Sequence, residues 1–382
     1  MIQVTLTETK MTYTQLKEFS VVYTDRSLNH MSDEFVDIMK DISRILKKAY
    51  NADSSVIVPG SGTFGMEAVA RQFANNEPVL IIRNGWFSYR WTQIFDMAGI
   101  TDQVDVITGT QVEDTTTGQY IPPDINDVVD RIHTLRPPIV FAPHVETSCG
   151  MILPDDYLAQ IGQACHDTGT LFVLDCIASG AAWVDMKALN IDIVITAPQK
   201  GWSSAPCCAL IAMSSRAREM LNDTKSTSYS MDILKWTQIM ETYEQGKFIY
   251  HTTMPTNALR ELRDTMIETE NLGFDYLKNR QYDLGMQVRN MLISYGYPSV
   301  AKDGYYAPGV VVCYTTDKNI QNATKFRELG YQTAAGVPLQ LNERTDFSTF
   351  RIGLFGIDKL MNIDSTVDSL KQALEQIKEE NK

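Results

Sequence analysis

The sequence predicts an α/β protein whose large domain contains a mostly parallel, doubly wound sheet. Between about residues 54 and 212, short runs rich in Val, Ile and Leu alternate with segments of helical periodicity. The apolar runs lack polar alternation, which is typical of strands buried on both faces. Strands that alternate with helices form parallel sheets covered by helices on both sides. From about residue 276 the pattern changes to that of a smaller α+β domain.

Each element of the large domain follows from these patterns. Strands are expected within residues 54–63, 77–85, 103–108, 137–147, 170–175, 191–197 and 206–214, and helices within 62–76, 87–99, 124–136 and 155–169. Residues 215–248 are predicted to be helical and amphipathic, and a long helix is expected to begin after Pro255. The predicted domains are 21–275 (large) and 276–382 (small), with residues 1–20 as an N-terminal segment that packs against the small domain.

Composition and charge exclude several classes of protein. The net charge of −13 argues against binding to nucleic acid or to an anionic membrane. No apolar run approaches the roughly 20 residues of a membrane-spanning helix, and the N-terminus lacks the apolar core of a signal peptide. The six cysteines show no metal-ligand spacing and are typical of reduced thiols in a cytoplasmic protein. The five histidines form no HxxxH or HxH pattern, so no metal site is expected.

Lys200 is the first candidate for chemistry. It follows the apolar segment "IDIVITA" after Pro198 and Gln199, and it is the only charged residue between Asp192 and Arg216. Lys200 is either a loop lysine at the exit of a strand or a desolvated amine that reacts with a carbonyl group.

Three further features fall at predicted strand ends, where an open parallel sheet places its ligand site. The turn "PGSGTFGMEA" (residues 59–68) opens a helix, and it is either a phosphate-binding turn or merely a tight connection. Asp175 ends the strand "TLFVLD"; it either caps a helix or holds a protonated pyridine nitrogen. Trp86 and Phe87 supply a ring that could cover a planar cofactor, although such aromatics are often core residues. Together with Lys200, these features match the order that a pyridoxal phosphate site requires.

The chain resembles class V aminotransferases of fold type I, close to the alanine–glyoxylate, serine–pyruvate and 2-aminoethylphosphonate–pyruvate group. Matching stretches occur in the same order over most of the chain. They are "HMSDEF", "GSGTFGMEA", "NGWFSYR", "HVETSCG", "VLDCIASG", "QKGW", "YHTTMP" and "RIGLFG".

The resemblance implies roles for individual residues. Lys200 would form the Schiff base with pyridoxal 5′-phosphate, Asp175 would hold the pyridine nitrogen, and Ile177 would lie under the ring. Phe87 matches the stacking aromatic, with Trp86 as a competitor. The other implied positions are the phosphate-binding Ser61, Gly62, Thr63 and Gln199, the hydroxyl residues Thr147 and Ser148, and the substrate-carboxylate residue Arg351.

The resemblance also implies a homodimer with shared active sites, because Tyr250 and Thr253 match residues that reach the phosphate from the other subunit. The implied reaction moves an amino group from an alanine- or serine-like donor to a 2-oxo acid such as glyoxylate or pyruvate, with ping-pong kinetics. Two departures concern the substrate pocket: "FSVVYTDRSLNH" is shorter than its family counterpart and lacks Gly and Pro, and "SSAPCC" replaces a Gly/Pro-rich loop.

Four alternatives remain open. A 2-aminoethylphosphonate–pyruvate transaminase and a β-elimination lyase would use the same site. A cysteine desulfurase would need a histidine directly before the lysine and a cysteine on a mobile loop, whereas here Gln199 precedes Lys200 and Cys313 lies within the apolar run "GVVVCY". A cofactor-sensing regulator would need an added DNA-binding domain. The choice of substrate does not follow from the resemblance.

Overall fold

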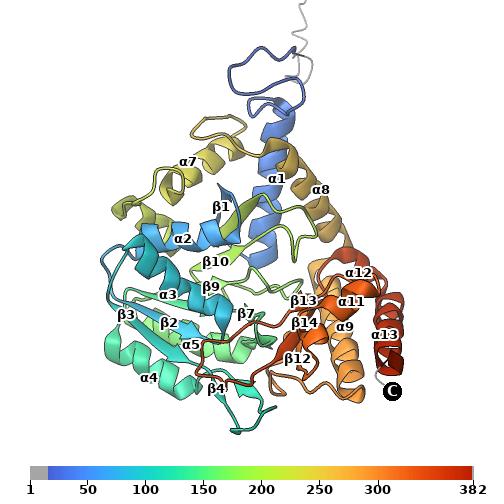
Figure 1. The fold of residues 1–382 in the computed structure, drawn as a ribbon. Helices are drawn as coiled ribbons and strands as arrows, with labels where there is room; N and C mark the ends of the chain where they lie inside the picture. Colours follow the sequence, from blue (N-terminus) through green and yellow to red (C-terminus); the bar gives the residue numbers. More distant parts are fainter. Residues whose placement is uncertain (1–15, 381–382) are drawn as a thin grey trace, which may run out of the picture.

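The large domain contains a seven-stranded sheet in the order β1, β11, β10, β9, β6, β2, β3 (Figure 1). The structure is a computed structural model and describes residues 16–380. The strands are β1 (Ser54–Pro59), β2 (Val79–Arg83), β3 (Val104–Thr108), β6 (Ile139–Pro143), β9 (Leu171–Asp175), β10 (Ile193–Thr196) and β11 (Cys208–Met213).

This sheet confirms the predicted mostly parallel arrangement. Strands β3, β2, β6, β9 and β10 pair in parallel, while β11 runs antiparallel to both β10 and β1. Every residue of β6, β9, β10 and β11 is buried, as expected for strands covered on both faces. Because β1 and β10 are both antiparallel to β11, β1 points in the same direction as the parallel strands.

Helices cover both faces of the sheet. Ser55 in β1 donates a hydrogen bond to Ser43 in α1 at 2.7 Å. Gly65 in α2 lies so close to β11 that a Cβ atom there would be 2.5 Å from that of Ala209. Ser55 pairs with Ala212, and side chains alternate along a strand, so Ser55 and Ala209 point to opposite faces. The sheet is therefore doubly wound, as predicted.

The helices of the large domain and its short strand pairs have the following bounds. The helices are α1 (Asp33–Tyr50), α2 (Gly62–Phe73), α3 (Trp86–Ala98), α4 (Ile125–Leu135), α5 (Asp155–Thr168), α6 (Ser215–Met220), α7 (Ile233–Glu244) and α8 (Thr256–Leu272). The short pairs are β4 (Thr110–Gln111) with β5 (Tyr120–Ile121), and β7 (Val145–Glu146) with β8 (Met151–Ile152).

The prediction of helix throughout residues 215–248 is wrong. Helix α6 and a 3₁₀ turn (Leu221–Asp223) are separated from α7 by an irregular segment, and the residues after Glu244 are also non-helical. The irregular segment is rich in Ser and Thr, whose side chains compete for backbone hydrogen bonds. Ser226 Oγ accepts from Ser228 N at 3.1 Å, and Asp232 then caps α7 by accepting from Lys235 N.

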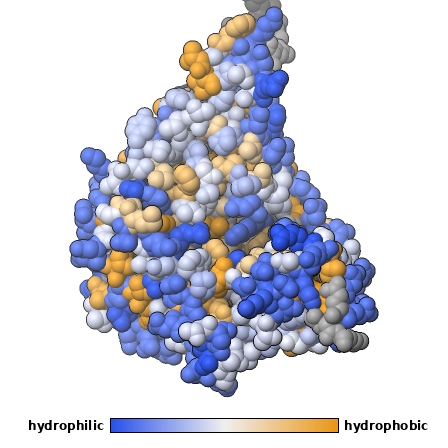
Figure 2. All heavy atoms as spheres, in the orientation of Figure 1, coloured by the Kyte–Doolittle hydropathy of each residue, from blue (hydrophilic) through white to orange (hydrophobic). Residues whose placement is uncertain are grey.

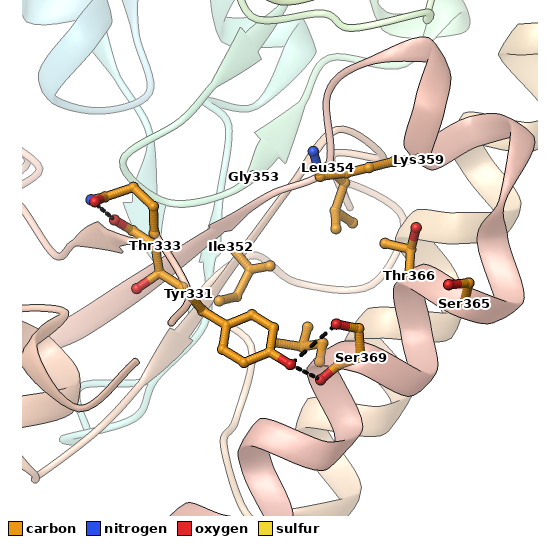
Figure 3. A pocket seen from close by; sticks show the side chains of 11 residues that line it. Tyr331, Thr333, Ile352, Gly353, Leu354, Lys359, Ser365, Thr366 and Ser369 are labelled. Carbon is orange, nitrogen blue, oxygen red and sulfur yellow. Dashed lines mark hydrogen bonds between the residues drawn. The ribbon is translucent and has the colours of Figure 1, made fainter. Parts of the chain in front are cut away.

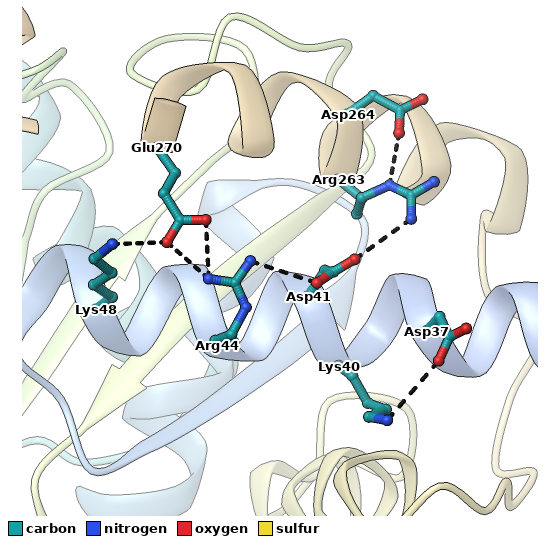
Figure 4. Close-up of polar contacts among 8 residues, drawn as sticks. All are labelled: Asp37, Lys40, Asp41, Arg44, Lys48, Arg263, Asp264 and Glu270. Carbon is teal, nitrogen blue, oxygen red and sulfur yellow. Dashed lines mark hydrogen bonds and ion pairs between the residues drawn. The ribbon is translucent and has the colours of Figure 1, made fainter. Parts of the chain in front are cut away.

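Ion pairs join α1 to α8, as Figure 4 shows. Glu270 in α8 accepts from Arg44 at 2.7 Å and from Lys48 at 2.9 Å, and Arg263 lies 3.5 Å from Asp41. Most of these side chains are partly exposed, so each pair contributes little on its own, and the apolar faces of the helices supply most of the stability.

The small domain packs helices around the three-stranded antiparallel sheet β12–β14–β13. The break between α8 and α9 is at Gly273, which has φ of 95° and lies close to the predicted boundary after residue 275; the boundary itself stays a prediction. The elements are α9 (Phe274–Ser294), β12 (Val310–Tyr314), α10 (Lys318–Gln321), α11 (Thr324–Glu328), β13 (Ala334–Ala335), β14 (Thr349–Gly353), α12 (Ile357–Met361) and α13 (Ile363–Glu380).

The predicted packing of residues 1–20 against the small domain falls mainly on residues 1–15, which lie outside the described residues. Glu18, which is described, accepts a hydrogen bond from Asn29 at 2.8 Å in the loop that precedes α1.

The buried Asp192 directly precedes β10 and links the neighbouring strand β9 to the segment that follows β11, so its substitution tests what this link contributes to stability. It is 5% exposed, and it accepts from Phe172 N at 3.0 Å, Ser214 Oγ at 2.9 Å and Arg216 Nε at 3.0 Å. We expect Asp192→Ala to lower the free energy of unfolding by about 2–4 kcal/mol, because buried donors and a guanidinium lose their partner. Guanidinium chloride unfolding measures this change.

Asp264→Ala is the matched control, because Asp264 pairs with Arg263 on the surface and its side chain is 61% exposed. That variant should lose less than about 1 kcal/mol. Equal losses in the two variants would contradict the importance given to Asp192.

Candidate active site

One cavity lies at the carboxyl edge of the sheet. Segments that follow β1, β2, β6, β9 and β10 all contribute to it, which is the position expected for a ligand site in an open parallel sheet. Its lining residues are Ser61, Gly62, Thr63, Met66, Phe87, Arg90, Val145, Thr147, Asp175, Ile177, Ala178, Gln199 and Lys200.

Asp175 is the last residue of β9, the fourth of the seven strands. Its side chain is 9% exposed and accepts from Ile177 N at 2.9 Å. Burial raises the pKa of Asp175 to about 6, because the ionised carboxylate loses hydration, although the Ile177 N–H and the charge of Lys200 partly oppose this. No helix follows Asp175 before β10 in the described chain, so Asp175 is not a helix cap.

Lys200 lies in a turn that begins two residues after β10 ends at Thr196. Burial lowers the pKa of Lys200, and the positive charges of Arg351 and Arg90 lower it further, while Asp175 acts in the opposite direction. Its Nζ atom lies 5.7 Å from the centre of the Phe355 ring, which belongs to the small domain. Within residues 16–380 no carboxylate oxygen lies within 4 Å of this amine. A desolvated amine of lowered pKa suits nucleophilic chemistry better than a solvated loop lysine does.

The start of α2 presents free backbone N–H groups to the cavity. Ser61 is the N-cap but its side chain makes no capping hydrogen bond, and the first turn of α2 contains no acidic residue. The first N–H groups of a helix have no partner within the helix, so those of Gly62 and Thr63 are available to an anion. A Cβ atom at Gly62 would lie 2.6 Å from Cδ1 of Ile177, so a larger residue there would have to displace the Ile177 side chain, which also lines the cavity.

The neighbouring aromatic residues Phe87 and Trp86 pack in different surroundings. Phe87 lines the cavity, whereas Trp86 packs beside Tyr89, with ring centres 6.0 Å apart. Of the two candidates for the aromatic platform, the structure therefore places Phe87 at the cavity.

Glu146 fixes the start of α3, and sequence reasoning gave it no role. This residue is 1% exposed and accepts from Phe87 N at 3.2 Å, from Ser88 N at 2.9 Å and from Ser88 Oγ at 2.7 Å. It also accepts from Ser148 N at 3.1 Å and Ser148 Oγ at 2.6 Å. A carboxylate at a helix N-terminus interacts favourably with the helix dipole, so Glu146 holds Phe87 in place.

Of the other residues predicted to bind the cofactor, some line the cavity and some do not. Thr147 lines the cavity, but Ser148 does not, because its hydroxyl is fully buried between Trp86 N and Glu146. Tyr250 and Thr253 lie between α7 and α8, outside the cavity lining, and their hydroxyls are 3.1 Å apart.

Arg351 in β14 reaches toward the cavity from the small domain. Its Nε atom donates to Ala335 O at 2.8 Å, and its Cζ atom lies 5.5 Å from the centre of the Phe87 ring. Burial lowers the pKa of Arg351, and the negative charge of Glu146 opposes this shift.

Sequence reasoning also missed Arg90 and the cavity residues Met66, Val145 and Ala178. Arg90 lies within the quoted stretch "NGWFSYR", three residues after Phe87. Residues three apart on a helix lie on the same face, so this spacing could have placed Arg90 beside Phe87.

A second cavity lies within the small domain (Figure 3). Tyr331, Ile352 and residues of α13 border it, and the Tyr331 hydroxyl donates to Ser369 O at 2.9 Å. Its polar lining is made of hydroxyls, an amide and Lys359, and it contains none of the predicted site residues.

Comparison with known proteins gives consistent similarities. The family model for aminotransferase class-V matches residues 3–302. Alanine–glyoxylate aminotransferase 1 of Saccharomyces cerevisiae is 31% identical over 252 residues, which are 62% of this chain and 62% of that protein's own length.

Solved structures share the fold over nearly the whole chain. That of alanine–glyoxylate aminotransferase from Nostoc sp. is 23% identical, has a TM-score of 0.76 and covers 91% of this chain and 89% of its own. The structure of ureidoglycine–glyoxylate aminotransferase from Bacillus subtilis is 22% identical and has a TM-score of 0.73. It covers 90% of this chain and 86% of its own. None of the helices in residues 16–380 has the length and apolar composition needed to cross a bilayer.

The raised pKa of Asp175 predicts a pH-dependent difference between the cofactor-free protein and its Asp175→Asn variant. The pKa of this carboxyl is about 6 in the folded chain and near 3.8 when unperturbed. The folded state therefore binds more protons between these values, so the contribution of Asp175 to stability is lost as the pH rises from 4 to above 6. Relative to the wild type, the variant should gain about 2–3 kcal/mol between pH 4 and pH 7. Urea unfolding across this range measures the difference, and a difference that does not change with pH would contradict the shift.

Proposed function

The chain belongs to the class V aminotransferase family, whose members depend on pyridoxal phosphate, and we propose that it binds this cofactor around Lys200. We further propose that it transfers an amino group from an alanine- or serine-like amino acid to a 2-oxo acid such as glyoxylate or pyruvate. The observation that carries the proposal is the meeting of a desolvated amine, a buried carboxylate, a free helix N-terminus and an aromatic ring in one cavity.

The residues of the cavity fit the cofactor. The N–H groups that begin α2, with the side chains of Ser61, Thr63 and Gln199, would hold its phosphate. Phe87 would cover one face of the ring and Ile177 would support the other, with the hydroxyl of Thr147 nearby. Asp175 would accept a hydrogen bond from the ring nitrogen, and a cation at that position would favour the ionised carboxylate. When bound, the cofactor withdraws electrons from the carbon that carries the amino group and so makes its proton acidic.

Lys200 would have two tasks. Its Nζ atom would hold the cofactor covalently and, once released by the incoming amine, would accept the proton from the substrate α-carbon. The lowered pKa of Lys200 suits both tasks, because a larger fraction of the amine is unprotonated near neutral pH. Asp175 would keep its negative charge beside the ring nitrogen of the cofactor, at the end of the ring opposite to the point where Lys200 is attached.

The desulfurase alternative loses support because of Cys313. This thiol lies within β12 and is fully buried, and burial raises its pKa to about 12. A neutral thiol inside a strand is a poor nucleophile.

Arg351 would bind the substrate carboxylate, because its guanidinium reaches Phe87 from the small domain. The same group would bind a phosphonate, so 2-aminoethylphosphonate is the second candidate donor. Alanine, serine and 2-aminoethylphosphonate should therefore each be assayed as donors against pyruvate, glyoxylate and 2-oxoglutarate. Exclusive use of an amine without an anionic group would refute the role of Arg351.

We also infer a homodimer and a cytoplasmic location. Tyr250 is 51% exposed and its chain neighbour Ile249 is 44% exposed, and in the loop that precedes α1 Phe19 and Val21 are 89% and 102% exposed. Figure 2 shows apolar side chains at the narrow upper end of the molecule, over the loop that precedes α1. Such exposed residues favour contact with a second chain. A sedimentation mass of one 43.0 kDa chain would refute the dimer. The six free, buried cysteines support a reducing compartment.

We predict that Lys200→Ala abolishes covalent cofactor attachment and lowers turnover by about a thousandfold or more, because nucleophile and base are lost together. Borohydride reduction followed by peptide mapping locates the modified lysine. Lys187→Ala is the control, because Lys187 is an exposed lysine paired with Asp53. A label on any lysine other than Lys200 would overturn the assignment, and an unchanged circular dichroism spectrum would show that the variant is folded.

We predict that Arg351→Ala raises KM for alanine or serine by about thirtyfold or more, because the substrate carboxylate loses its partner in a site of low dielectric. Cofactor affinity should change much less. Arg344→Ala controls for charge, since Arg344 is an exposed arginine of the same domain that pairs with Asp346 and Asp114. Equal KM values for the two variants would show that Arg351 does not bind the substrate.

A further inference from the structure

Arg90 is a charged residue of the cavity to which the resemblance gives no role. It lies in α3, one turn after Phe87, and its Nη1 atom donates to Thr63 Oγ1 at 3.0 Å. Its Cζ atom lies 5.2 Å from the centre of the Phe87 ring. The guanidinium therefore connects the aromatic platform to the first turn of α2.

The charge of Arg90 has no carboxylate partner within 4 Å in the part of the chain that the structure describes. Its bond to Thr63 uses one of five guanidinium donors. The nearby Arg71 differs, because it pairs with Glu67 at 2.8 Å. The positive charge of Arg90 also lowers the pKa of both Asp175 and Lys200, so its field reaches the centre of the cavity.

We propose that Arg90 is an anion-binding residue of this cavity and that it holds the phosphate of the cofactor together with the N–H groups at the start of α2. This inference rests on the proposed function. Arg90 contacts Thr63, which belongs to the phosphate-binding turn, whereas Arg351 approaches from the small domain, where the substrate carboxylate is expected.

The physical reason is that a helix N-terminus supplies only a partial positive charge. A phosphate monoester carries close to two negative charges at neutral pH, and α2 offers about half an elementary charge. A guanidinium adds a permanent full charge and two parallel donors for phosphate oxygens. Arg90 is also pre-organised, because Glu146 fixes the first turn of α3 and the Phe87 ring lies against the guanidinium.

The experiment compares binding of pyridoxal phosphate and of pyridoxal to the cofactor-free full chain, for the wild type and Arg90→Gln. Loss of a charged phosphate ligand should raise the dissociation constant of pyridoxal phosphate by about tenfold to a hundredfold. The constant for pyridoxal, which lacks the phosphate, should stay within about twofold. The dissociation constant of pyridoxal phosphate for Arg90→Lys should lie between those of the wild type and Arg90→Gln. Lysine keeps the positive charge but loses the two parallel donors of the guanidinium.

Arg71→Gln is the matched control, since it removes a neighbouring arginine that already has a carboxylate partner. It should bind both compounds as the wild type does. A second readout is the ³¹P signal of the bound cofactor: it should stay that of the dianion down to lower pH in the wild type than in Arg90→Gln, because a nearby cation favours the charged form.

Three results would overturn the inference. Equal weakening for pyridoxal phosphate and pyridoxal would mean that Arg90 only positions Phe87. Unchanged cofactor binding with a raised KM for 2-oxoglutarate, but not for pyruvate, would mean that Arg90 binds a second acidic group of the substrate. If the wild type itself discriminates little between the two compounds, the phosphate is not held as proposed. Failure of the wild type to bind pyridoxal phosphate at all would instead refute the proposed function.

Discussion

The burial of Asp175 at the end of the central strand is the constraint on which the rest of the site depends. Strands β6 and β10 flank β9 in parallel, so the segments that follow all three must meet around this carboxylate. The segment after β6 brings Thr147 and Glu146, and the turn after β10 brings Lys200. Burial is the main cause of the pKa shifts of both Asp175 and Lys200, and in each the charge of the other opposes it. The fold thus holds two groups in a place where neither is stable as a lone ion.

The cavity has an excess of positive charge that an anionic ligand would relieve. Lys200 and Arg90 line it and Arg351 reaches toward it, while Asp175 is the carboxylate among the lining residues of the described chain. Glu146 lies beneath the cavity, but its oxygens are occupied by the N–H and hydroxyl groups around the start of α3. A phosphate at α2 and a carboxylate at Arg351 would therefore offset positive charges that have no carboxylate partner within 4 Å in the described chain. Binding of such ligands should be linked to stability, since they bind the folded state alone.

The sequence predicted those parts of the site whose place depends only on where strands end. Asp175 ends a strand, and Lys200 and the Ser61–Thr63 turn follow strands. The rule that parallel strands end at one edge brings them together. The antiparallel direction of β11 could not be predicted, because its apolar run looks the same in either direction. The choice between Phe87 and Trp86 depends on packing, and the role of Glu146 depends on five hydrogen bonds from three residues that no local pattern encodes. Tyr250 and Thr253 would act on a second chain, so one chain cannot show their role.

The turn that carries Lys200 also contacts the small domain, so Lys200 and Arg351 are held in a fixed relation to each other. Ile357 N donates to Ser203 Oγ at 2.8 Å, and Ser203 itself has a left-handed conformation with φ of 57°. A serine tolerates that conformation poorly, so the surrounding contacts must hold it. Phe355, from the same small-domain segment, faces Nζ of Lys200. Arg351 lies in β14, which leads directly into this segment. A shift of the small domain would therefore move the Arg351 guanidinium and the surroundings of the Lys200 amine as one unit.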